Sequence, residues 1–185
     1  MSAAKKLFSL PEYHSFTQRS EGKFEYYYGE IFAMSGGSRR HSLIAANFIR
    51  EAGNALKGKP CAVYTSDLRI AVQAGKHYTC PDASILCGET TFDQHITDTA
   101  NNPRVIVEVI SPSTEAYDRG RKAAHYRRMD SLRELLMISQ DEPHIEIHRR
   151  QNDDTWSITD AMDMDGMLQL QSVDITICVR EIYDR

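Results

Sequence analysis

Two acidic residues, Asp82 and Glu108, stand inside segments that otherwise have the character of buried β-strands. Asp82 follows Pro81 in the run YTCPDASILC, and proline donates no hydrogen bond to a sheet. Glu108 is the single charge in VIVEVI, whose two faces are both apolar, as in a strand covered on both sides. A carboxylate is costly to bury unless it is paired or binds a metal. Each residue is therefore a candidate metal ligand or catalytic acid, with a salt bridge to a core Arg or Lys as the alternative.

The spacing of the two carboxylates predicts that they are neighbours. If the strands at 78–87 and 104–110 pair antiparallel, the polar segment GETTFDQHITDTANN is their connection. A pairing of residue 82 with residue 108 has its midpoint at residue 95, in the centre of that segment. Adjacent carboxylates repel unless a cation lies between them, and oxygen ligands suit Mg²⁺ or Mn²⁺. The pattern thus predicts a site in which Asp82 and Glu108 hold Mg²⁺ or Mn²⁺.

The segment after Glu108 supplies a candidate lysine. SPST ends the strand and offers Ser113 or Thr114 as a helix cap, and the helix predicted over about 115–130 reads EAYDRGRKAAHYRRMD. Asp118 and Lys122 lie four residues apart, hence on one face of that helix. A solvent-exposed ion pair is one interpretation. In the other, Lys122 reaches back over the carboxylates and stabilises charge on a phosphate oxygen.

Pro-Asp followed about 25 residues later by Glu in an apolar strand resembles the PD-(D/E)XK nuclease superfamily, although Ile110 stands where its lysine is expected. The segments PDASIL, EVISPST with DRGRK, YYYGEIFAMSGGSRRHSLIAANF and REIYDR are similar to the Uma-type restriction endonuclease family, in which the lysine has moved to the next helix. The resemblance covers nearly the whole chain. It implies an endonuclease that hydrolyses DNA phosphodiester bonds, with Asp82 and Glu108 on the metal and Lys122 as the catalytic lysine. It also places Glu30 and His41 near the site.

The alternative function is an inactive nuclease fold that binds nucleic acid or serves in assembly. A structural domain in which Asp82, Glu108 and Lys122 form a buried ion network is a further possibility. A locally basic region around the two helices suits phosphate contact; its members are Arg39, Arg40, Arg119, Arg121, Arg127, Arg128 and Arg133. Because two strands must be cut, a homodimer is the expected assembly.

Local sequence patterns predict the helices and strands that carry these residues. A helix begins after Ser9 with a capping box to Glu12, a hairpin turns near Tyr28-Gly29, and a second helix runs over about 38–56. Further strands are expected at 61–72, 134–140 and 144–150. The order predicts a mixed α/β (α+β) domain over 1–185: a restriction-endonuclease-like core with one mixed sheet, flanking helices and an N-terminal hairpin.

Composition limits the classes of protein to which the chain can belong. The chain has 185 residues, 41% of them hydrophobic and 26% charged, and a net charge of −4, which argues against coating of nucleic acid by the whole surface. No apolar stretch approaches the ~20 residues that span a bilayer, so no membrane contact is expected. The four cysteines show neither a disulfide framework nor a zinc motif, which favours free thiols and a cytoplasmic location.

Overall fold

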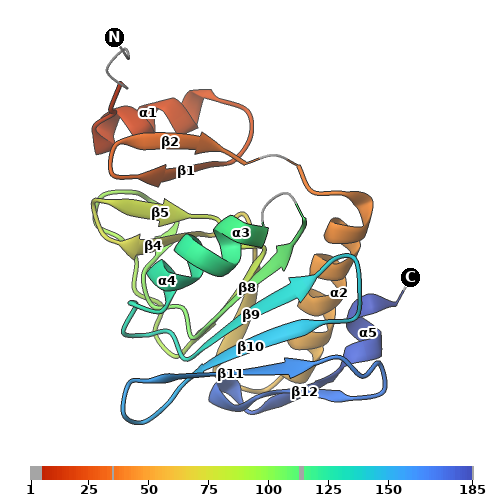
Figure 1. The fold of residues 1–185 in the computed structure, drawn as a ribbon. Helices are drawn as coiled ribbons and strands as arrows, with labels where there is room; N and C mark the ends of the chain where they lie inside the picture. The colour runs from red at the N-terminus through yellow and green to blue at the C-terminus, as the bar shows by residue number, and fades with distance from the viewer. Residues whose placement is uncertain (1–5, 35, 113–114, 185) are drawn as a thin grey trace.

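A computed structural model describes residues 6–34, 36–112 and 115–184. Its strands form three sheets (Figure 1), of six, five and two strands, where the sequence predicted one. The six-stranded sheet has the order β11-β10-β9-β8-β6-β3, and its strands are Cys61–Thr65 (β3), Ala83–Cys87 (β6), Val105–Ile110 (β8), Glu134–Ser139 (β9), Ile145–Arg150 (β10) and Trp156–Ala161 (β11). Only the central pair β8 and β9 is parallel; the other neighbours run antiparallel.

The central strand β8 is covered on both faces, as its sequence predicts. Val105, Val107 and Val109 pack into one core with helix α2 (Arg39–Ala55). That core also contains side chains of Met167–Leu170 (β12), Ile175–Cys178 (β13) and helix α5 (Val179–Tyr183). Ile106 and Ile110 pack on the opposite face into a second core, which contains Tyr126. Every residue of β8 is buried, so its one glutamate is buried with it.

The N-terminal elements build the five-stranded sheet. Helix α1 (Leu10–Arg19) begins at the predicted capping box of Ser9 and Glu12. It packs through Tyr13 against this sheet, and Tyr26 and Tyr78 belong to the same apolar cluster. The sheet has the order β2-β1-β5-β4-β7, with strands Phe24–Tyr27 (β1), Glu30–Ala33 (β2), Arg69–Gln73 (β4), His77–Thr79 (β5) and Thr99–Ala100 (β7). β1 and β2 form the predicted hairpin, with Tyr28 and Gly29 at positive φ.

The helix predicted over 115–130 is shorter and less regular than expected. It consists of α3 (Glu115–Tyr117), a π-helical turn η1 (Asp118–Lys122) and α4 (Ala123–Tyr126). A 3₁₀ turn η2 (Gln171–Val173) precedes β13. The proposed caps Ser113 and Thr114 lie outside the described residues. None of the helices within the described ranges is long and apolar enough to cross a membrane.

Three further sequence-based expectations, about two strands and about the cysteines, are wrong. The run 78–87 is two strands rather than one, because the chain leaves one sheet after Thr79 and enters the other at Ala83. The run 61–72 likewise divides between β3 and β4. Cys61 and Cys87 are joined by a disulfide instead of being free, since β3 and β6 pair with these two residues opposite each other. Cys80 and Cys178 are free thiols, as expected.

Candidate active site

Asp82 stands where the chain crosses between the two large sheets. Residues 80–82 link β5 to β6, and Pro81 is tolerated there because this link needs no ladder donor. Ala83 pairs with Val107 and Ser84 with Ile106, so the same register continued by one residue sets Asp82 opposite Glu108. This is the predicted antiparallel register. The side chain of Asp82 takes over the ladder bond at this point, because its Oδ2 accepts the backbone N–H of Val109 at 2.7 Å.

Glu108 lies on β8 on the face that α4 covers, and it is 4% exposed. Its Oε1 is 2.9 Å from the ammonium nitrogen of Lys122 and accepts the hydroxyl of Tyr126 at 2.6 Å. Burial raises the pKa of Glu108 to about 8, although Lys122 opposes this shift and the charge of Asp82 adds to it. The carboxylate is therefore held in one orientation by two donors on the helix above it.

Lys122 is the last residue of the π-helical turn η1 and is 5% exposed. Its Nζ contacts Glu108 and also Oε1 of Glu25, at 3.2 Å, on the hairpin strand β1. Burial alone would lower the pKa of Lys122, but the carboxylates of Glu108 and Glu25 raise it well above its ordinary value. Single π-turns within helices are frequent at functional sites.

The neighbouring cations of the same turn are directed elsewhere. Arg119 pairs with Glu115 and with Glu146 of β10, and Arg121 is exposed. The geometry thus brings Lys122, and neither arginine, to Glu108. Asp118 is buried rather than part of an exposed pair with Lys122, and its charge contributes to the raised pKa of Glu108.

Of the two residues that the family resemblance places near the site, Glu30 and His41, the histidine lies at it. It occupies the first turn of α2, whose cap is Ser38, and its Nε2 is 3.2 Å from Oδ2 of Asp82. The hydrogen bond to Asp82 raises the pKa of His41 against the effect of burial, and the charges of Asp82 and Glu108 add to the shift. Glu30 is at the start of β2, opposite Tyr27 in the hairpin, and the hairpin residue that contacts Lys122 is Glu25 instead.

Glu25 and Tyr126 are contacts of the site that the sequence analysis missed. Tyr126 follows Lys122 by four residues, so helical spacing places both on one face of the helix. That spacing is a sequence pattern from which Tyr126 could have been predicted as a site residue. Glu25 is 7% exposed, and it reaches Lys122 because β1 pairs with β5, which leads into the crossover before Asp82. No local pattern in KFEYYY distinguishes this glutamate from an exposed hairpin residue.

The donor set suits a hard divalent cation held by few protein ligands. Within the ranges that the structure describes, no three His, Cys, Asp or Glu side chains are grouped to hold a metal. Asp82 and Glu108 offer carboxylate oxygens from facing register positions. Mg²⁺ keeps several waters and is commonly bound by one or two carboxylates together with substrate phosphates. Two adjacent carboxylates therefore fit such an ion without a third side chain.

The basic residues near the site are divided between exposed and internal roles. Arg39 and Arg40 are exposed at the start of α2, beside His41, and Arg121 and Arg128 are exposed around α4. Arg127, in contrast, is within 3.2 Å of Nδ1 of the buried His148. Arg133 lies before β9, at the opposite end of the six-stranded sheet. The predicted basic region is thus smaller than the sequence indicated.

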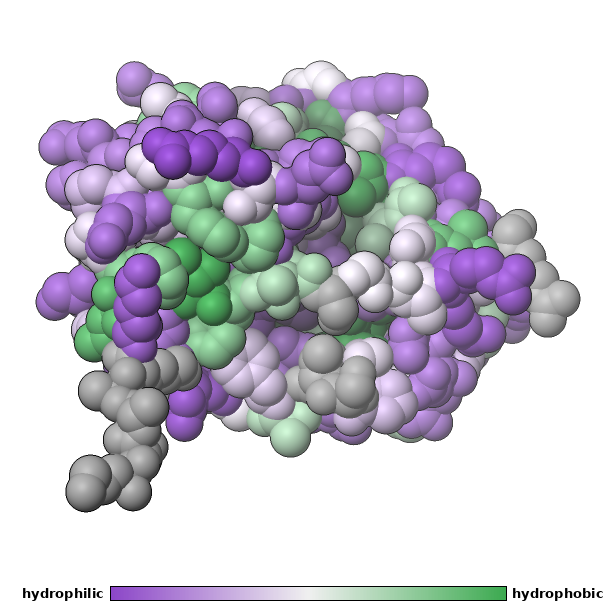
Figure 2. Space-filling view, turned by 90° about the horizontal axis from the view of Figure 1, so that it is seen from above, coloured by the Kyte–Doolittle hydropathy of each residue, from purple (hydrophilic) through white to green (hydrophobic). Residues whose placement is uncertain are grey.

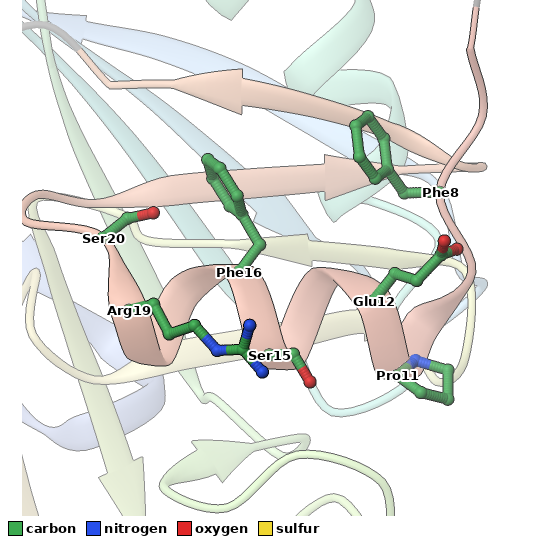
Figure 3. Close-up of a pocket in the computed structure, with 7 residues that line it drawn as sticks. All are labelled: Phe8, Pro11, Glu12, Ser15, Phe16, Arg19 and Ser20. Carbon is green, nitrogen blue, oxygen red and sulfur yellow. The ribbon is translucent and has the colours of Figure 1, made fainter.

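A pocket of 430 Å³ lies away from these carboxylates, on helix α1. Figure 3 shows its lining, with the rings of Phe8 and Phe16 on one side of the helix, and the lining residues are Phe8, Pro11, Glu12, Ser15, Phe16, Arg19 and Ser20. Seen from above, hydrophobic residues gather over the N-terminal helix and hairpin (Figure 2). Large apolar side chains exposed in these elements and beside them are Leu7, Phe16, Tyr28 and Phe32.

A family model described as "Uma2: Putative restriction endonuclease" matches residues 10–177, which is most of the chain. The chain belongs to the Uma2 family. This membership confirms the family resemblance that the Pro-Asp, EVISPST and DRGRK segments carry.

Two proteins of Synechocystis sp. (strain ATCC 27184 / PCC 6803 / Kazusa) are similar along most of their length. Uncharacterized protein slr1290 is 37% identical over 175 residues, covering 95% of this chain and 90% of that protein. Uncharacterized protein sll1609 is 27% identical over 160 residues, covering 86% and 90%.

The crystal structure of a putative nuclease belonging to DUF820 from Anabaena variabilis ATCC 29413 superposes with a TM-score of 0.74. The match covers 95% of this chain and 97% of that one at 18% identity, so it bears on the fold alone. The mixed α+β, restriction-endonuclease-like fold expected for this Uma2 protein is confirmed.

Proposed function

We propose that this Uma2 protein is a metal-dependent endonuclease that hydrolyses phosphodiester bonds of DNA. The observation that carries the proposal is the register of β6 and β8, which sets Asp82 opposite Glu108, with Lys122 2.9 Å from the glutamate. The family description supports the same class of activity. In this proposal Asp82 and Glu108 are the metal ligands, Mg²⁺ or Mn²⁺ is the cofactor, and Lys122 is the catalytic lysine.

The contacts of the two carboxylates suggest how they would bind the ion. Oδ2 of Asp82 is engaged by Val109 and His41, and Oε1 of Glu108 by Lys122 and Tyr126. We propose that Oδ1 of Asp82 and Oε2 of Glu108 face the cation. A bound divalent ion would supply an activated water and offset charge on the scissile phosphate.

The surrounding residues would complete the chemistry. Lys122 keeps a positive charge beside the carboxylates, since its pKa is raised, and would stabilise negative charge that develops on a phosphate oxygen. His41 orients Asp82 through its 3.2 Å contact. Asp118 contributes negative charge next to Glu108. Glu30 interacts with another residue and lies in the adjoining hairpin, and we propose no chemical role for it.

We propose DNA as the partner because exposed arginines lie on or beside the elements that carry site residues. Arg39 and Arg40 begin α2, which carries His41, and Arg121 and Arg128 lie in η1 and just after α4, close in sequence to Lys122. We propose that these arginines contact phosphates. A homodimer is the proposed assembly, since cleavage of both strands calls for two sites. The edge strand β2 and the exposed apolar residues beside it are a candidate dimer surface.

A second function, an inactive nucleic-acid-binding or assembly module, is favoured by one observation. Lys122 and Glu108 are each 6% exposed at the side chain, and Lys122 is paired with two carboxylates. A lysine enclosed in this way resembles a buried ion network that has a structural role. The two functions differ in whether the protein cuts DNA.

The test is cleavage of supercoiled plasmid and linear DNA with Mg²⁺, with Mn²⁺ and with chelator. We expect cleavage only with metal, and a loss of 10²-fold or more in Asp82→Asn and Glu108→Gln, of the order that loss of a charge-stabilising group produces. Asp98→Asn is the matched control, because Asp98 is exposed and asparagine accepts its positive φ. If the parent protein cuts no DNA with either metal, the inactive module replaces the endonuclease.

A further inference from the structure

A second pocket, of 510 Å³, lies at the other end of the six-stranded sheet from the candidate site. It is lined by Arg104, Arg133, Glu134, Arg149, Arg150, Gln151, Asn152, Asp154, Gln171 and Ser172. Arg104 directly precedes β8, whereas Glu108 is four residues further along, about 13 Å at ~3.3 Å per residue. The pocket is thus at the tails of the β8 and β9 arrows in Figure 1, away from α3.

Three of its arginines lie side by side at the ends of neighbouring strands, Arg104 and Arg133 just before β8 and β9 and Arg150 at the end of β10. The backbone N–H of Arg133 donates to the carbonyl of Arg104 at 2.9 Å, and that of Arg150 donates to the carbonyl of Arg133 at 2.9 Å. Like charges side by side on adjacent strands are destabilising. A bound anion would remove this repulsion.

Two of the guanidinium groups are held in place by the protein. Arg150 donates to the carbonyls of Leu132, Arg127 and Met129, and its side chain is 8% exposed. Arg149 pairs with Glu134 at 2.9 Å and donates to a backbone carbonyl. Because these side chains are already ordered, an anion would not bear the cost of ordering them.

The two carboxylates of the pocket pair with Arg149 and Arg150 and do not neutralise the other two arginines. Glu134 is 1% exposed and accepts the backbone N–H groups of Gln171 and Ser172 as well as Arg149. Asp154 is exposed and 3.4 Å from Arg150. Among the described residues, no ion pair is found for Arg104 or Arg133. Four arginines against two acids leave a charge of +2 in the pocket of a chain whose net charge is −4.

We propose that this pocket binds the phosphate groups of a ligand, in a stretch about as long as a pyrophosphate. Guanidinium groups match phosphate oxygens through paired hydrogen bonds, and the pocket's volume lies within the ~300–1,000 Å³ of small-ligand sites. Its walls are polar rather than apolar, so the charge of the ligand would carry the recognition. Free nucleotides and the phosphorylated ends of nucleic acids both present this chemistry.

The test is calorimetric titration with pyrophosphate at low ionic strength, with chelator present so that no metal bridges phosphate to Asp82 or Glu108. We expect binding to the parent and at least 10-fold weaker binding to Arg104→Gln/Arg133→Gln. The control, Arg19→Gln/Arg180→Gln, removes two charges elsewhere and should bind as the parent does. Absence of binding to the parent, or equal weakening in both double variants, would overturn the proposal.

Two further arms identify the source of the phosphate. Tighter binding of ATP than of inorganic triphosphate assigns the pocket to free nucleotides, whereas dependence of oligonucleotide binding on a 5′-phosphate assigns it to nucleic-acid ends. The exposed single variant Arg104→Gln repeats the test if the double variant does not fold. Asp82→Asn should bind pyrophosphate as the parent does, so the pocket is tested independently of the endonuclease.

Discussion

Replacing Lys122 with methionine would remove the cation between two buried carboxylates while keeping a side chain of similar length. Lys122 contacts Glu108 at 2.9 Å and Glu25 at 3.2 Å, and all three residues are buried. Breaking a buried ion pair from one side costs about 3–5 kcal/mol, because the other charge is left uncompensated. We expect Lys122→Met to lower the free energy of unfolding by this amount where Glu108 is ionised.

The cost should depend on pH in a defined direction. The pKa of Glu108 is raised from 4.5 to about 8, so its protonation stabilises the fold fully below pH 4.5, and this contribution is lost as pH rises through 8. Removing Lys122 raises that pKa further, and the variant then loses more stability than the parent between pH 6 and 9. The difference in the free energy of unfolding between the two proteins should therefore widen as pH rises.

Urea unfolding of both proteins at pH 6 and pH 9 measures this gap. Arg121→Met is the matched control, since Arg121 is exposed on the same turn and its loss should change stability by no more than about 0.5 kcal/mol. A difference in the free energy of unfolding below about 1 kcal/mol at pH 9, or one that narrows as pH rises, would show that Lys122 does not compensate the buried charge of Glu108.

Two other predictions concern stability. Burial lowers the pKa of His77 to about 3, with His125 and Lys122 adding to the shift, so its contribution is present above pH 6.5 and is lost as pH falls below that value. Between pH 6.5 and pH 5, the free energy of unfolding of the parent should fall by about 2 kcal/mol more than that of His77→Phe. Urea unfolding at both pH values measures the two changes. Equal changes in the two proteins would show that His77 is not kept neutral by the fold. The double variant Cys61→Ser/Cys87→Ser removes a disulfide that joins residues with a sequence separation of 26. We expect its free energy of unfolding to be about 3–4 kcal/mol lower than that of the parent, as measured by thermal unfolding. No change would show that the bond does not form in the protein.

The pairing of Asp82 with Glu108 could be predicted from sequence because it depends on only two features, the alternation of one strand and the length of the connection. The alternation in VIVEVI places Glu108 on a defined face, and the length of the connection centres the pairing on residue 95. The position of Lys122 came from family resemblance together with helical spacing. Both are local or nearly local patterns.

What could not be predicted depends on contacts between distant segments. The apolar run 78–87 carries no mark of the sheet to which each half belongs, so its sequence predicts one strand interrupted at Pro81 instead of a crossover between two sheets. The disulfide needs the pairing of β3 with β6, which brings together residues far apart in sequence. Glu25 reaches Lys122 only because the hairpin joins the sheet through β5.

We propose that Asp82 and Glu108 together bind the divalent ion. Calorimetric titration of Mn²⁺ into the parent and into Asp82→Asn tests it most directly, because asparagine preserves shape and removes one ligand charge. We expect one Mn²⁺ site in the parent and clearly weaker binding in the variant. Identical isotherms for the two proteins, or no Mn²⁺ binding by the parent, would contradict it.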